Sequence, residues 1–515
     1  MLKRLLLGSP DYDFIVNGLE TGFDLCFEGE RVSTIGKNSM SVNANLQAAR
    51  DKVRAELKQG RIAGPFSSPP FPVFKVAPLA LREKATPGKF RLLHDLSHPY
   101  DDRSTNAGIP DGAAKVSYAS IKDAIDIVKQ YECAFMAKAD IKDAYRNLPI
   151  SVDSQWLVGF KLDGATYHDL RIPMGARSSC FIFERFSGAL KYILHNTYKV
   201  KHIVKLLDDF LFIGETKQEC QMGLDAFLHL CNWINLPVAH DKTIEPNTKV
   251  TFLGIDLDSA NNVASIPREK ISKYKEAVRE LQKLPVVRVR QLREVIGKLQ
   301  FVTSIIRGGR CFLRRLHDAL IGDQNNYRLV TLSPEMRADL RTWVGFMDLF
   351  NGRGFITYAD ERTGAMVAMG SDASKTGYGG YLGAKVIAGV FPKSWQEWDI
   401  EALELYPILA LVATFRRVLA GKTVRAKCDN LPLVHCLNKL TSKNKQVMRL
   451  MRPLVLILLA ENIVIRAEYI SSEDNHLCDT LSRQQVGKDW LLSQGKEAHL
   501  SPLASFVLAR NLKLQ

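Results

Sequence analysis

Two adjacent aspartates interrupt an apolar, β-rich run, and this pair narrows what the chain can fold into more than any other feature. Asp208 and Asp209 lie within HIVKLLDDFLFIG (202–214). Neighbouring carboxylates repel each other and lose solvation when they are buried. The pair is therefore either a solvated hairpin tip or part of a carboxylate set that holds divalent cations at strand ends. Asp140, which follows the apolar stretch AFMAKA, is a candidate third member of that set.

Helical and β-type patterns alternate across residues 118–258, which favours an α+β domain. Upstream, residues 46–60 are typical of an exposed helix ended by a glycine, and apolar runs around ATPGK predict an antiparallel hairpin within 72–96. Residues 268–320 are helical and basic, and the turn-rich segment 351–364 is a candidate linker. A second α/β unit of about domain size follows it.

Four further acids occupy the second unit in places where an apolar element ends or is interrupted. They are Asp372 in GSDASKTGYGGYLG, Glu404 in IEALELYPILALV, Asp429 in TVRAKCDN and Asp479 in SSEDNHLCDTLSRQ. A single acid in any of these places would be a helix cap or a solvated side chain. Four of them in this order indicate a two-metal site.

Three local features accompany this second set of acids. Glu401 competes with Glu404, because the two lie three residues apart on one helix, and we prefer Glu404. Ser471 or Ser472 is expected to cap the helix that carries Asp479. Pro407 is expected to remove a backbone hydrogen bond inside the helix of Glu404.

Charge and composition indicate the kind of partner and the compartment. Lys and Arg outnumber Asp and Glu by 70 to 55 in 515 residues, which favours a polyanionic partner as much as it favours a merely solvated basic surface. The nine cysteines are scattered without a C-x-x-C pair, as in a reducing compartment. No run resembles a signal peptide or spans a bilayer. We expect an intracellular protein, in the cytoplasm or the nucleus, that is not secreted and has no membrane partner.

A resemblance to reverse transcriptases covers nearly the whole chain. KADIKDAYRNLPI, IPMGARSSCFIFERFS, KLLDDFLFIG, DKTIEPNT and VTFLGIDLD follow the order of the palm motifs of that family, and GKFRLLHDLS resembles its fingers strand. The likeness is closest to retrotransposons of the DIRS type, the tyrosine-recombinase class, in SPPF, FRLLHDLS, SYASIKDAI and TFLGIDLD with IPREK. The four acids of the second unit and the terminal DTLSR resemble a ribonuclease H.

This resemblance implies an α+β fold: a right-hand polymerase with fingers, palm and helical thumb, followed by an α/β ribonuclease H-like domain. The expected segments are an N-terminal extension (1–45), fingers and palm (46–260), thumb or connection (261–345), linker (346–364), ribonuclease H-like domain (365–487) and C-terminal tail (488–515).

The resemblance also assigns roles to the acids. It implies that Asp140, Asp208 and Asp209 are the polymerase carboxylates, with Asp140 and Asp208 binding both ions directly. In the same way it makes Asp372, Glu404, Asp429 and Asp479 the ligands of the ribonuclease H site. Each site is expected to take two Mg²⁺ ions, with Mn²⁺ as a substitute. Asp143 is expected to be a structural or surface acid.

Five residues match family positions that contact the substrates. Tyr145 would lie under the incoming sugar and exclude a 2′ hydroxyl. Lys89 and Arg91 would hold the triphosphate, and Gly175 would allow close backbone approach to the nucleotide or template. Lys242 matches a lysine expected to protonate the departing pyrophosphate.

The sequence also departs from the family pattern. Leu206 stands where an aromatic residue usually precedes x-D-D, which puts the packing of the primer end in question, and Met174 replaces the usual Gln or Phe. Cys478 and Thr480 differ from the family's A-D-A-L-S-R. His476 has no clear family counterpart and is read as incidental.

The basic helices of the expected thumb provide a surface that could follow a duplex backbone. The residues concerned are Arg288, Arg290, Arg293, Lys298, Arg307, Arg310, Arg314 and Arg315. For each of them singly, a solvated helical face is the alternative.

The leading hypothesis is an RNA-directed DNA polymerase with ribonuclease H activity that copies retrotransposon RNA into DNA. Its expected partners are an RNA template, a DNA primer, the RNA–DNA hybrid and dNTPs, with capsid and recombinase proteins encoded separately. One alternative is a decayed or domesticated element that only binds nucleic acid. Another is an RNA-synthesising polymerase, which Tyr145 and the ribonuclease H-like unit both disfavour.

Overall fold

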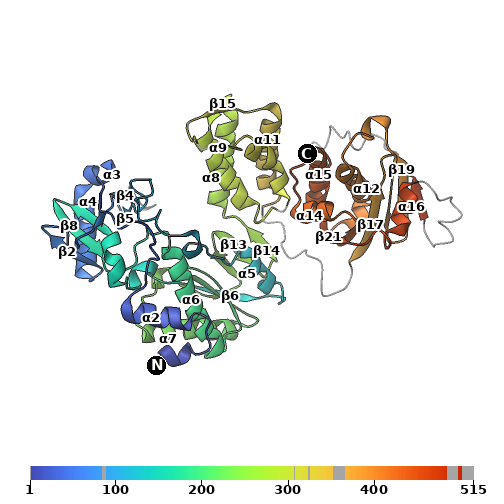
Figure 1. Cartoon of the computed structure of the whole chain (residues 1–515). Helices are drawn as coiled ribbons and strands as arrows, with labels where there is room; N and C mark the ends of the chain where they lie inside the picture. Colours follow the sequence, from blue (N-terminus) through green and yellow to red (C-terminus); the bar gives the residue numbers. More distant parts are fainter. Residues whose placement is uncertain are drawn as a thin grey trace. The chain divides into compact units, whose positions relative to one another are not determined.

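The computed structural model describes residues 2–83, 88–306, 308–322, 325–351 and 366–483, together with the backbone of residues 497–500. The chain divides into two compact units, Met1–Leu253 and Gly254–Gln515. Figure 1 shows the first unit in blue to green and the second in yellow to red. This division falls close to the predicted end of the palm at residue 260.

A four-stranded antiparallel sheet in the order β11-β6-β10-β9 forms the predicted palm. Its strands are β6 (Phe135–Asp140), β9 (His202–Leu206), β10 (Asp209–Gly214) and β11 (Ile244–Asn247). Helices α6 (Ser179–Asn196) and α7 (Lys217–Trp233) join the same core as alternate residues of β6 and β10, and α5 (Ile121–Val128) also lies against β9 and β10.

Strand β10 is apolar along its whole length after Asp209 because both of its faces are covered. Phe210 and Phe212 pack on Phe227 of α7, with ring centroids 4.7 Å and 5.6 Å away. Leu211 and Ile213, which point to the opposite face, are also buried. Side chains on both faces are thus excluded from water, which explains why this strand lacks polar alternation.

The predicted fingers contain a five-stranded sheet in the order β1-β3-β7-β8-β2 and a separate hairpin of β4 and β5. The elements are β1 (Thr34–Ile35), α3 (Met40–Ala44), α4 (Leu46–Lys58), β2 (Ile62–Phe66), β3 (Lys75–Val76), β4 (Leu79–Glu83), β5 (Phe90–His94), β7 (Gly159–Leu162) and β8 (Ala165–Asp169). The predicted helix at 46–60 and hairpin at 72–96 are confirmed, although residues 84–87 at the hairpin tip lie outside the described part.

The first 45 residues, predicted as an N-terminal extension, pack against the fingers and the palm. They form α1 (Leu2–Leu5), α2 (Tyr12–Thr21), β1 and α3. Ile15, Phe23 and Leu25 are buried in the same core as α6 and β10, and β1 pairs with β3. These contacts are made by single buried residues that are far apart in sequence, so the sequence shows no helical or strand periodicity that would predict them.

A buried ionic network joins the fingers to the segment that follows β6. Arg146 lies 2.7 Å from Asp169 and 2.8 Å from Glu56, and His94 Nδ1 lies 3.0 Å from Asp169. Burial alone would raise the pKa of Asp169, but Arg146 and His94 lower it below its usual value. The network therefore ties β5 and β8 to the short 3₁₀ helix Ala144–Asn147.

The second unit begins with a β-hairpin and a helical subdomain that corresponds to the predicted thumb. Its elements are β13 (Ile255–Asp258), β14 (Val263–Ser265), α8 (Arg268–Lys283), β15 (Val286–Arg288), α9 (Val289–Val302), α10 (Arg314–Asp318), β16 (Leu329–Thr331) and α11 (Pro334–Leu349). Strands β15 and β16 form a small antiparallel pair. Helix α11 packs on α8, and Trp343 of α11 is completely buried.

The C-terminal part contains a mixed six-stranded sheet in the order β21-β20-β17-β18-β19-β22. Its strands are β17 (Val367–Ala373), β18 (Gly377–Leu382), β19 (Lys385–Val390), β20 (Thr423–Cys428), β21 (Val464–Tyr469) and β22 (Glu497–Leu500). The helices are α12 (Ile400–Thr414), α13 (Arg416–Leu419), α14 (Leu431–Lys439), α15 (Lys445–Ala460) and α16 (His476–Ser482). Pro407 lies inside α12, as predicted.

The thumb-like helices and the C-terminal sheet share one hydrophobic core instead of being separated by a free linker. The predicted linker at 346–364 begins inside α11, where Phe346 and Met347 are buried. Residues 352–364 lie outside the described part. The tail had no readable pattern, yet residues 497–500 form β22 beside β19.

Among the described residues, no helix has the length and apolar character needed to cross a membrane.

The buried network predicts a large stability effect. Asp169→Asn leaves the Arg146 guanidinium without one of its two carboxylates, and we expect it to lower the free energy of unfolding by about 3–5 kcal/mol in urea titrations. Because the pKa of Asp169 is lowered in the folded state, its contribution is complete above the usual aspartate pKa of about 4 and is lost as pH falls further. The variant should therefore lose the most stability near neutral pH.

Asp163→Asn is the matched control. Asp163 pairs with Arg50 at 2.7 Å, but both side chains are more than one third exposed. Exposed pairs contribute little, so this variant should unfold like the wild type. Equal losses in the two variants would contradict the assignment of stability to the buried network.

Candidate active sites

The first carboxylate set forms where β6 and β10 end side by side. Asp209 is the register partner of Asp140 in the antiparallel ladder, and it also pairs with Leu206 across the β9–β10 hairpin. Leu207 and Asp208 form the two-residue turn, in which Leu207 has φ +53°. The N–H of Ile141, the residue after Asp140, donates to the carbonyl of Asp208 at 3.0 Å. These contacts bring together three acids that are up to 69 residues apart in sequence.

The three carboxylates differ in burial: Asp140 is buried, whereas Asp208 and Asp209 are partly exposed. Burial raises the pKa of Asp140, which is only 6% exposed, although Lys242 opposes the shift. Burial also raises the pKa of Asp208, and the charges of Asp140 and Asp209 add to the increase. Asp208 and Asp209 are therefore not an isolated hairpin tip, because their charges and that of Asp140 act on one another.

Two lysines neutralise part of this charge. Lys242 Nζ lies 3.0 Å and 3.1 Å from the two carboxylate oxygens of Asp140, and Lys138 Nζ lies 3.0 Å from Asp209 Oδ1. Asp208 is left without an ion pair among those the structure describes. A cluster of hard oxygen donors with excess negative charge fits a divalent cation such as Mg²⁺.

Tyr145 lies next to the carboxylate set, as the sequence predicted. Its hydroxyl is 3.3 Å from Cys180 Sγ, and its ring packs edge-on against Phe183 of α6, with centroids 5.3 Å apart. Burial raises the pKa of Tyr145 far above its usual value, helped by Cys180 and by the charge of Asp208. The ring is therefore fixed by α6 within electrostatic range of the β9–β10 turn.

The remaining predicted substrate residues lie on the fingers and the loop before α6. Lys89 and Arg91 are exposed at the start of β5. Gly175 faces the carbonyl of His94, and a Cβ added there would lie 1.9 Å from that oxygen. Glycine is therefore required at position 175 by the close approach of two backbone segments of the protein itself.

Asp143 pairs with Arg61 at 3.0 Å, in agreement with a structural role.

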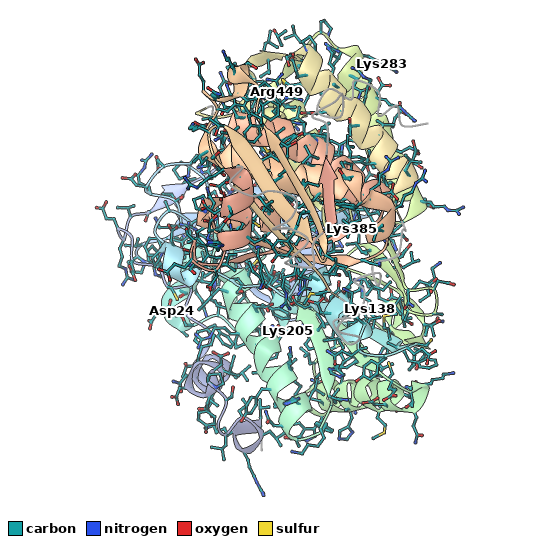
Figure 2. All side chains as sticks on the ribbon, turned by 90° about the vertical axis from the view of Figure 1, so that its right-hand side faces the viewer. Asp24, Lys138, Lys205, Lys283, Lys385 and Arg449 are labelled. Atoms are coloured by element: carbon teal, nitrogen blue, oxygen red, sulfur yellow. The ribbon has the colours of Figure 1, made fainter. Side chains whose placement is uncertain are left out.

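Sequence reasoning missed two residues beside this set. Glu184 of α6 accepts a hydrogen bond from the N–H of Leu207 at 2.9 Å and pairs with Lys205 of β9 at 2.6 Å. Figure 2 labels Lys205 next to this helix. Lys205 lies in the same apolar run as Asp208 and Asp209. A lysine at a strand position expected to be buried could have indicated that an acidic partner lies nearby.

The second carboxylate set gathers at one end of the mixed sheet. Asp372 is on β17, Glu404 is on α12, Asp429 directly follows β20 and Asp479 is on α16. Ligand atoms of Glu404, Cys428 and Asp429 all lie within 4.8 Å of one another. Ser482 of α16 donates to Asp372 Oδ2 at 2.5 Å, and Arg483 lies 2.8 Å from Asp479.

Burial and mutual charge together determine the electrostatics of this second set. Burial raises the pKa of Glu404 to about 8, and the charges of Asp429 and Asp372 contribute. Burial likewise raises the pKa of Asp372, with contributions from Asp429 and Asp479. Only carboxylates that lie close together interact in this way, and their oxygen donors fit a divalent cation.

The competition between Glu401 and Glu404 is settled by the side-chain contacts. Glu401 Oε1 accepts a hydrogen bond from the thiol of Cys436 at 3.2 Å. Glu404 is 8% exposed and interacts with Asp372 and Asp429. Of the two glutamates, Glu404 is thus the one that lies with Cys428 and Asp429.

Three residues of this site have roles that the sequence did not indicate. Ser472 was expected as a possible helix cap, but its hydroxyl donates to Asp429 Oδ2 at 2.9 Å, and Asn475 precedes α16. Ser471 bonds to Asp474 instead. The thiol of Cys428 lies 3.8 Å from Glu404 Oε2. These contacts depend on which strand ends meet, and no local spacing shows that.

Several of the basic thumb residues are already paired within the helices. Lys298 pairs with Glu294, Arg314 with Asp318 and Arg315 with Asp339, at 2.6, 2.5 and 2.9 Å. Arg288, Arg290 and Arg310 are exposed, whereas Arg307 lies outside the described residues. The basic surface is smaller than the count of arginines suggested.

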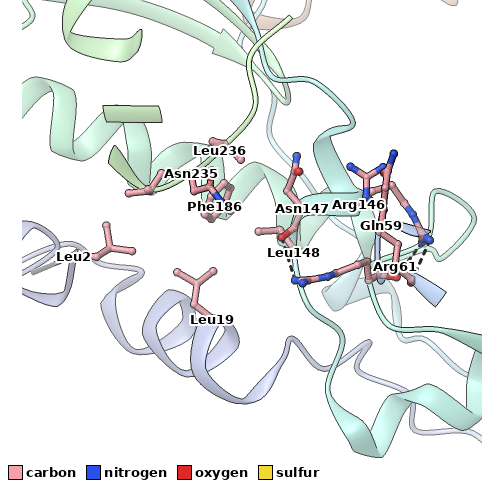
Figure 3. Close-up of a pocket in the computed structure, with 12 residues that line it drawn as sticks. Leu2, Leu19, Gln59, Arg61, Arg146, Asn147, Leu148, Phe186, Asn235 and Leu236 are labelled. Atoms are coloured by element: carbon pink, nitrogen blue, oxygen red, sulfur yellow. Dashed lines mark hydrogen bonds between the residues drawn. The ribbon is translucent and has the colours of Figure 1, made fainter. Parts of the chain in front are cut away.

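A cavity of about 270 Å³ lies in the first unit. Figure 3 shows Leu2 and Leu19 opposite Asn147 and Leu148, with Arg61 and Arg146 at one end. Of the described residues that line it, none belongs to either carboxylate set.

Comparison with known families now adds to this geometry. Residues 83–257 match the family described as "Reverse transcriptase (RNA-dependent DNA polymerase)". This match covers about a third of the chain and shows what that part is similar to. The matched range contains β5, the palm sheet and the first carboxylate set in the order that the sequence motifs predicted.

Relatives of the reverse transcriptase domain come from retroviruses and retroelements. The chain is 26% identical over 318 residues to the Gag-Pro-Pol polyprotein of Human T-cell leukemia virus 2, which covers 58% of the chain and 19% of that protein. It is 24% identical over 286 residues to the retrovirus-related Pol polyprotein from transposon gypsy of Drosophila melanogaster, covering 54% and 24%. The chain thus spans about a fifth to a quarter of these proteins.

A solved structure supports the fold over most of the chain. The foamy viral protease-reverse transcriptase in complex with double-stranded DNA superposes with a TM-score of 0.51 at 16% identity, covering 86% of this chain and 72% of that one. The fold is α+β, a right-hand polymerase followed by a ribonuclease H-like domain. The predicted fold class is confirmed, whereas the DIRS-type subclass stays a prediction.

The close approach at Gly175 gives a stability prediction. Gly175→Ala forces the added methyl group against the His94 carbonyl, and we expect it to lower the free energy of unfolding by about 1–3 kcal/mol. Gly112→Ala is the control, because a Cβ there meets nothing within 4 Å, and it should change stability by at most about 0.5 kcal/mol. Denaturant titration of both variants measures the difference. Equal stability of the two would show that the loop moves freely away from His94.

Proposed function

We propose that this protein is an RNA-directed DNA polymerase with ribonuclease H activity, which copies retroelement RNA into DNA and cleaves the RNA of the resulting hybrid. The observation that carries the proposal is the convergence of Asp140, Asp208 and Asp209 at adjacent strand ends inside a reverse transcriptase domain. The domain match alone suggests only the class of enzyme. The clustered acids add the metal ligands that catalysis requires.

Each polymerase residue has a distinct role in the proposed reaction. Mg²⁺ bound by the three aspartates would activate the primer 3′ hydroxyl and stabilise the leaving pyrophosphate. Lys242, within hydrogen-bonding distance of Asp140, is positioned to give a proton to pyrophosphate. The ring of Tyr145, fixed against Phe183, would leave no room for a 2′ hydroxyl and so select dNTPs. Lys89 and Arg91 would bind the triphosphate.

The second carboxylate set supports the hydrolytic activity. Burial raises the pKa of Glu404 to about 8, and the charges of Asp429 and Asp372 add to the increase. Asp479 joins the group through its effect on Asp372. A crowded, buried set of acids is unfavourable for folding unless cations offset the charge. Mg²⁺, or Mn²⁺ in its place, would supply that compensation and an activated water.

The nucleic-acid partners follow from the same reasoning. A net charge of +15 favours a polyanion, and the foamy viral neighbour is a complex with double-stranded DNA. We propose an RNA template, a DNA primer and their hybrid as ligands, with dNTPs as substrates. From the likeness to DIRS-type elements, we also propose that capsid and recombinase proteins are encoded separately. We propose that the protein acts inside the cell, in the cytoplasm or the nucleus.

The rival function is a protein that binds nucleic acid without catalysis. All seven acids are present in clusters, which argues for catalysis. Leu206 and Cys478 are the departures that favour the rival. They do not remove a carboxylate from either cluster.

Replacement of one polymerase carboxylate tests the proposal directly. Asp208→Asn removes a carboxylate charge that no described lysine or arginine pairs with and that we propose binds Mg²⁺. Primer extension on an RNA template with Mg²⁺ should therefore fall by at least about 10²-fold. Binding to an RNA–DNA hybrid should remain. Asp225→Asn on the exposed face of α7 is the control and should extend at the wild-type rate. Wild-type protein without any extension activity would favour the binding-only rival.

The two neighbouring glutamates of α12 test the second activity. Glu404→Gln should reduce cleavage of the RNA strand in a labelled hybrid by at least about 10²-fold, and it should leave primer extension intact because the polymerase carboxylates belong to a different cluster. Glu401→Gln should retain cleavage, since Glu401 contacts Cys436 and not the acids. Cleavage that survives Glu404→Gln and is lost in Glu401→Gln would contradict the assignment.

A further inference from the structure

The metal-binding turn of the polymerase set has an unusual backbone. Leu207, the first residue of the turn, has φ +53°, a conformation that is unfavourable for a residue with a branched side chain. Such a conformation persists only when surrounding contacts fix it. Asp208 follows directly, so the conformation of Leu207 decides where the carboxylate of Asp208 points.

Two hydrogen bonds hold the backbone of this turn. The carbonyl of Asp208 accepts from the N–H of Ile141 at 3.0 Å, which links the turn to β6. The N–H of Leu207 donates to Glu184 Oε2 at 2.9 Å, which links the turn to α6. The second bond is made by a side chain, so its geometry depends on what orients Glu184.

Lys205 orients Glu184. Its Nζ donates to Glu184 Oε1 at 2.6 Å, to the Glu184 carbonyl at 2.7 Å and to Ser187 Oγ at 2.9 Å. All three ammonium protons thus have an acceptor on α6. The Lys205 and Glu184 side chains are 9% and 14% exposed, so water competes little for either charge.

We infer that the buried Lys205–Glu184 pair positions the metal-binding turn for nucleotide addition, with Glu184 as the acceptor that fixes Leu207 and Lys205 as the group that fixes Glu184. The pair is a positioning device, because neither side chain belongs to the carboxylate set.

This inference rests on the proposed polymerase function, and a pair of variants in the full-length chain tests it. The double variant Glu184→Leu/Lys205→Met removes both charges and keeps similar volume, so the protein should still fold with a melting temperature close to the wild type. The N–H of Leu207 then has no acceptor. We expect the rate of single-nucleotide addition at saturating dNTP to fall at least tenfold and the Mg²⁺ concentration for half-maximal rate to rise.

Arg185→Met is the matched control. Arg185 is the next residue of α6 and pairs with Asp11 at 2.6 Å, away from the turn. It should keep the wild-type rate and Mg²⁺ dependence, even if its melting temperature falls. Glu184→Gln serves if the double variant does not fold: the amide has one oxygen, so Lys205 or Leu207 loses its acceptor and the rate should fall in the same direction.

A double variant, or a Glu184→Gln variant, that adds nucleotides at the wild-type rate and Mg²⁺ concentration would overturn the inference. The same holds if Arg185→Met loses as much activity as they do. Hydrogen exchange at the Leu207 amide provides a readout without catalysis, and it should be faster in the double variant than in the wild type. If wild-type protein adds no nucleotide, the proposed function fails, and exchange at Leu207 alone then decides whether Glu184 holds the turn.

Discussion

Repulsion among carboxylates that the fold itself brings together is the constraint on which the rest of the structure depends. Asp140 and Asp209 are register partners, and the turn of Asp208 is bonded to the residue after Asp140. Apolar strands, covered on both faces by helices, carry these acids to one edge. The lysines at positions 138 and 242 offset part of the charge, and the remaining excess is what makes the place suited to cations.

The second set meets the same constraint with different surroundings. Hydroxyl groups of Ser472 and Ser482 donate to Asp429 and Asp372, and Arg483 pairs with Asp479, whereas two lysines pair with acids of the first set. Burial, together with the charges of Asp429 and Asp372, raises the pKa of Glu404 to about 8. The two clusters thus share acids and burial, yet they differ in how much positive charge the protein itself provides.

The sequence predicted the parts of this protein that depend on short-range patterns. Period and turn residues located α4, the β4–β5 hairpin and the palm strands, and the acids interrupting apolar runs marked both clusters. Long-range pairing escaped prediction. The burial of Ile15 and Phe23 in the palm core, the bond from Ser472 to Asp429 and the pair of Glu184 with Lys205 join residues whose own neighbourhoods are unremarkable. The choice of Glu404 over Glu401 needed the contacts of both side chains.

The shared core of the second unit has a consequence for dissecting the protein. Gly308 lies against Val455 and Leu440, and Asp339 is placed between Arg315 and Arg452. A cut within residues 352–365 would separate two fragments that pack against each other through apolar side chains and through the buried Asp339. Each fragment would then present that surface to solvent and tend to aggregate, so point substitutions are the safer way to isolate one activity from the other.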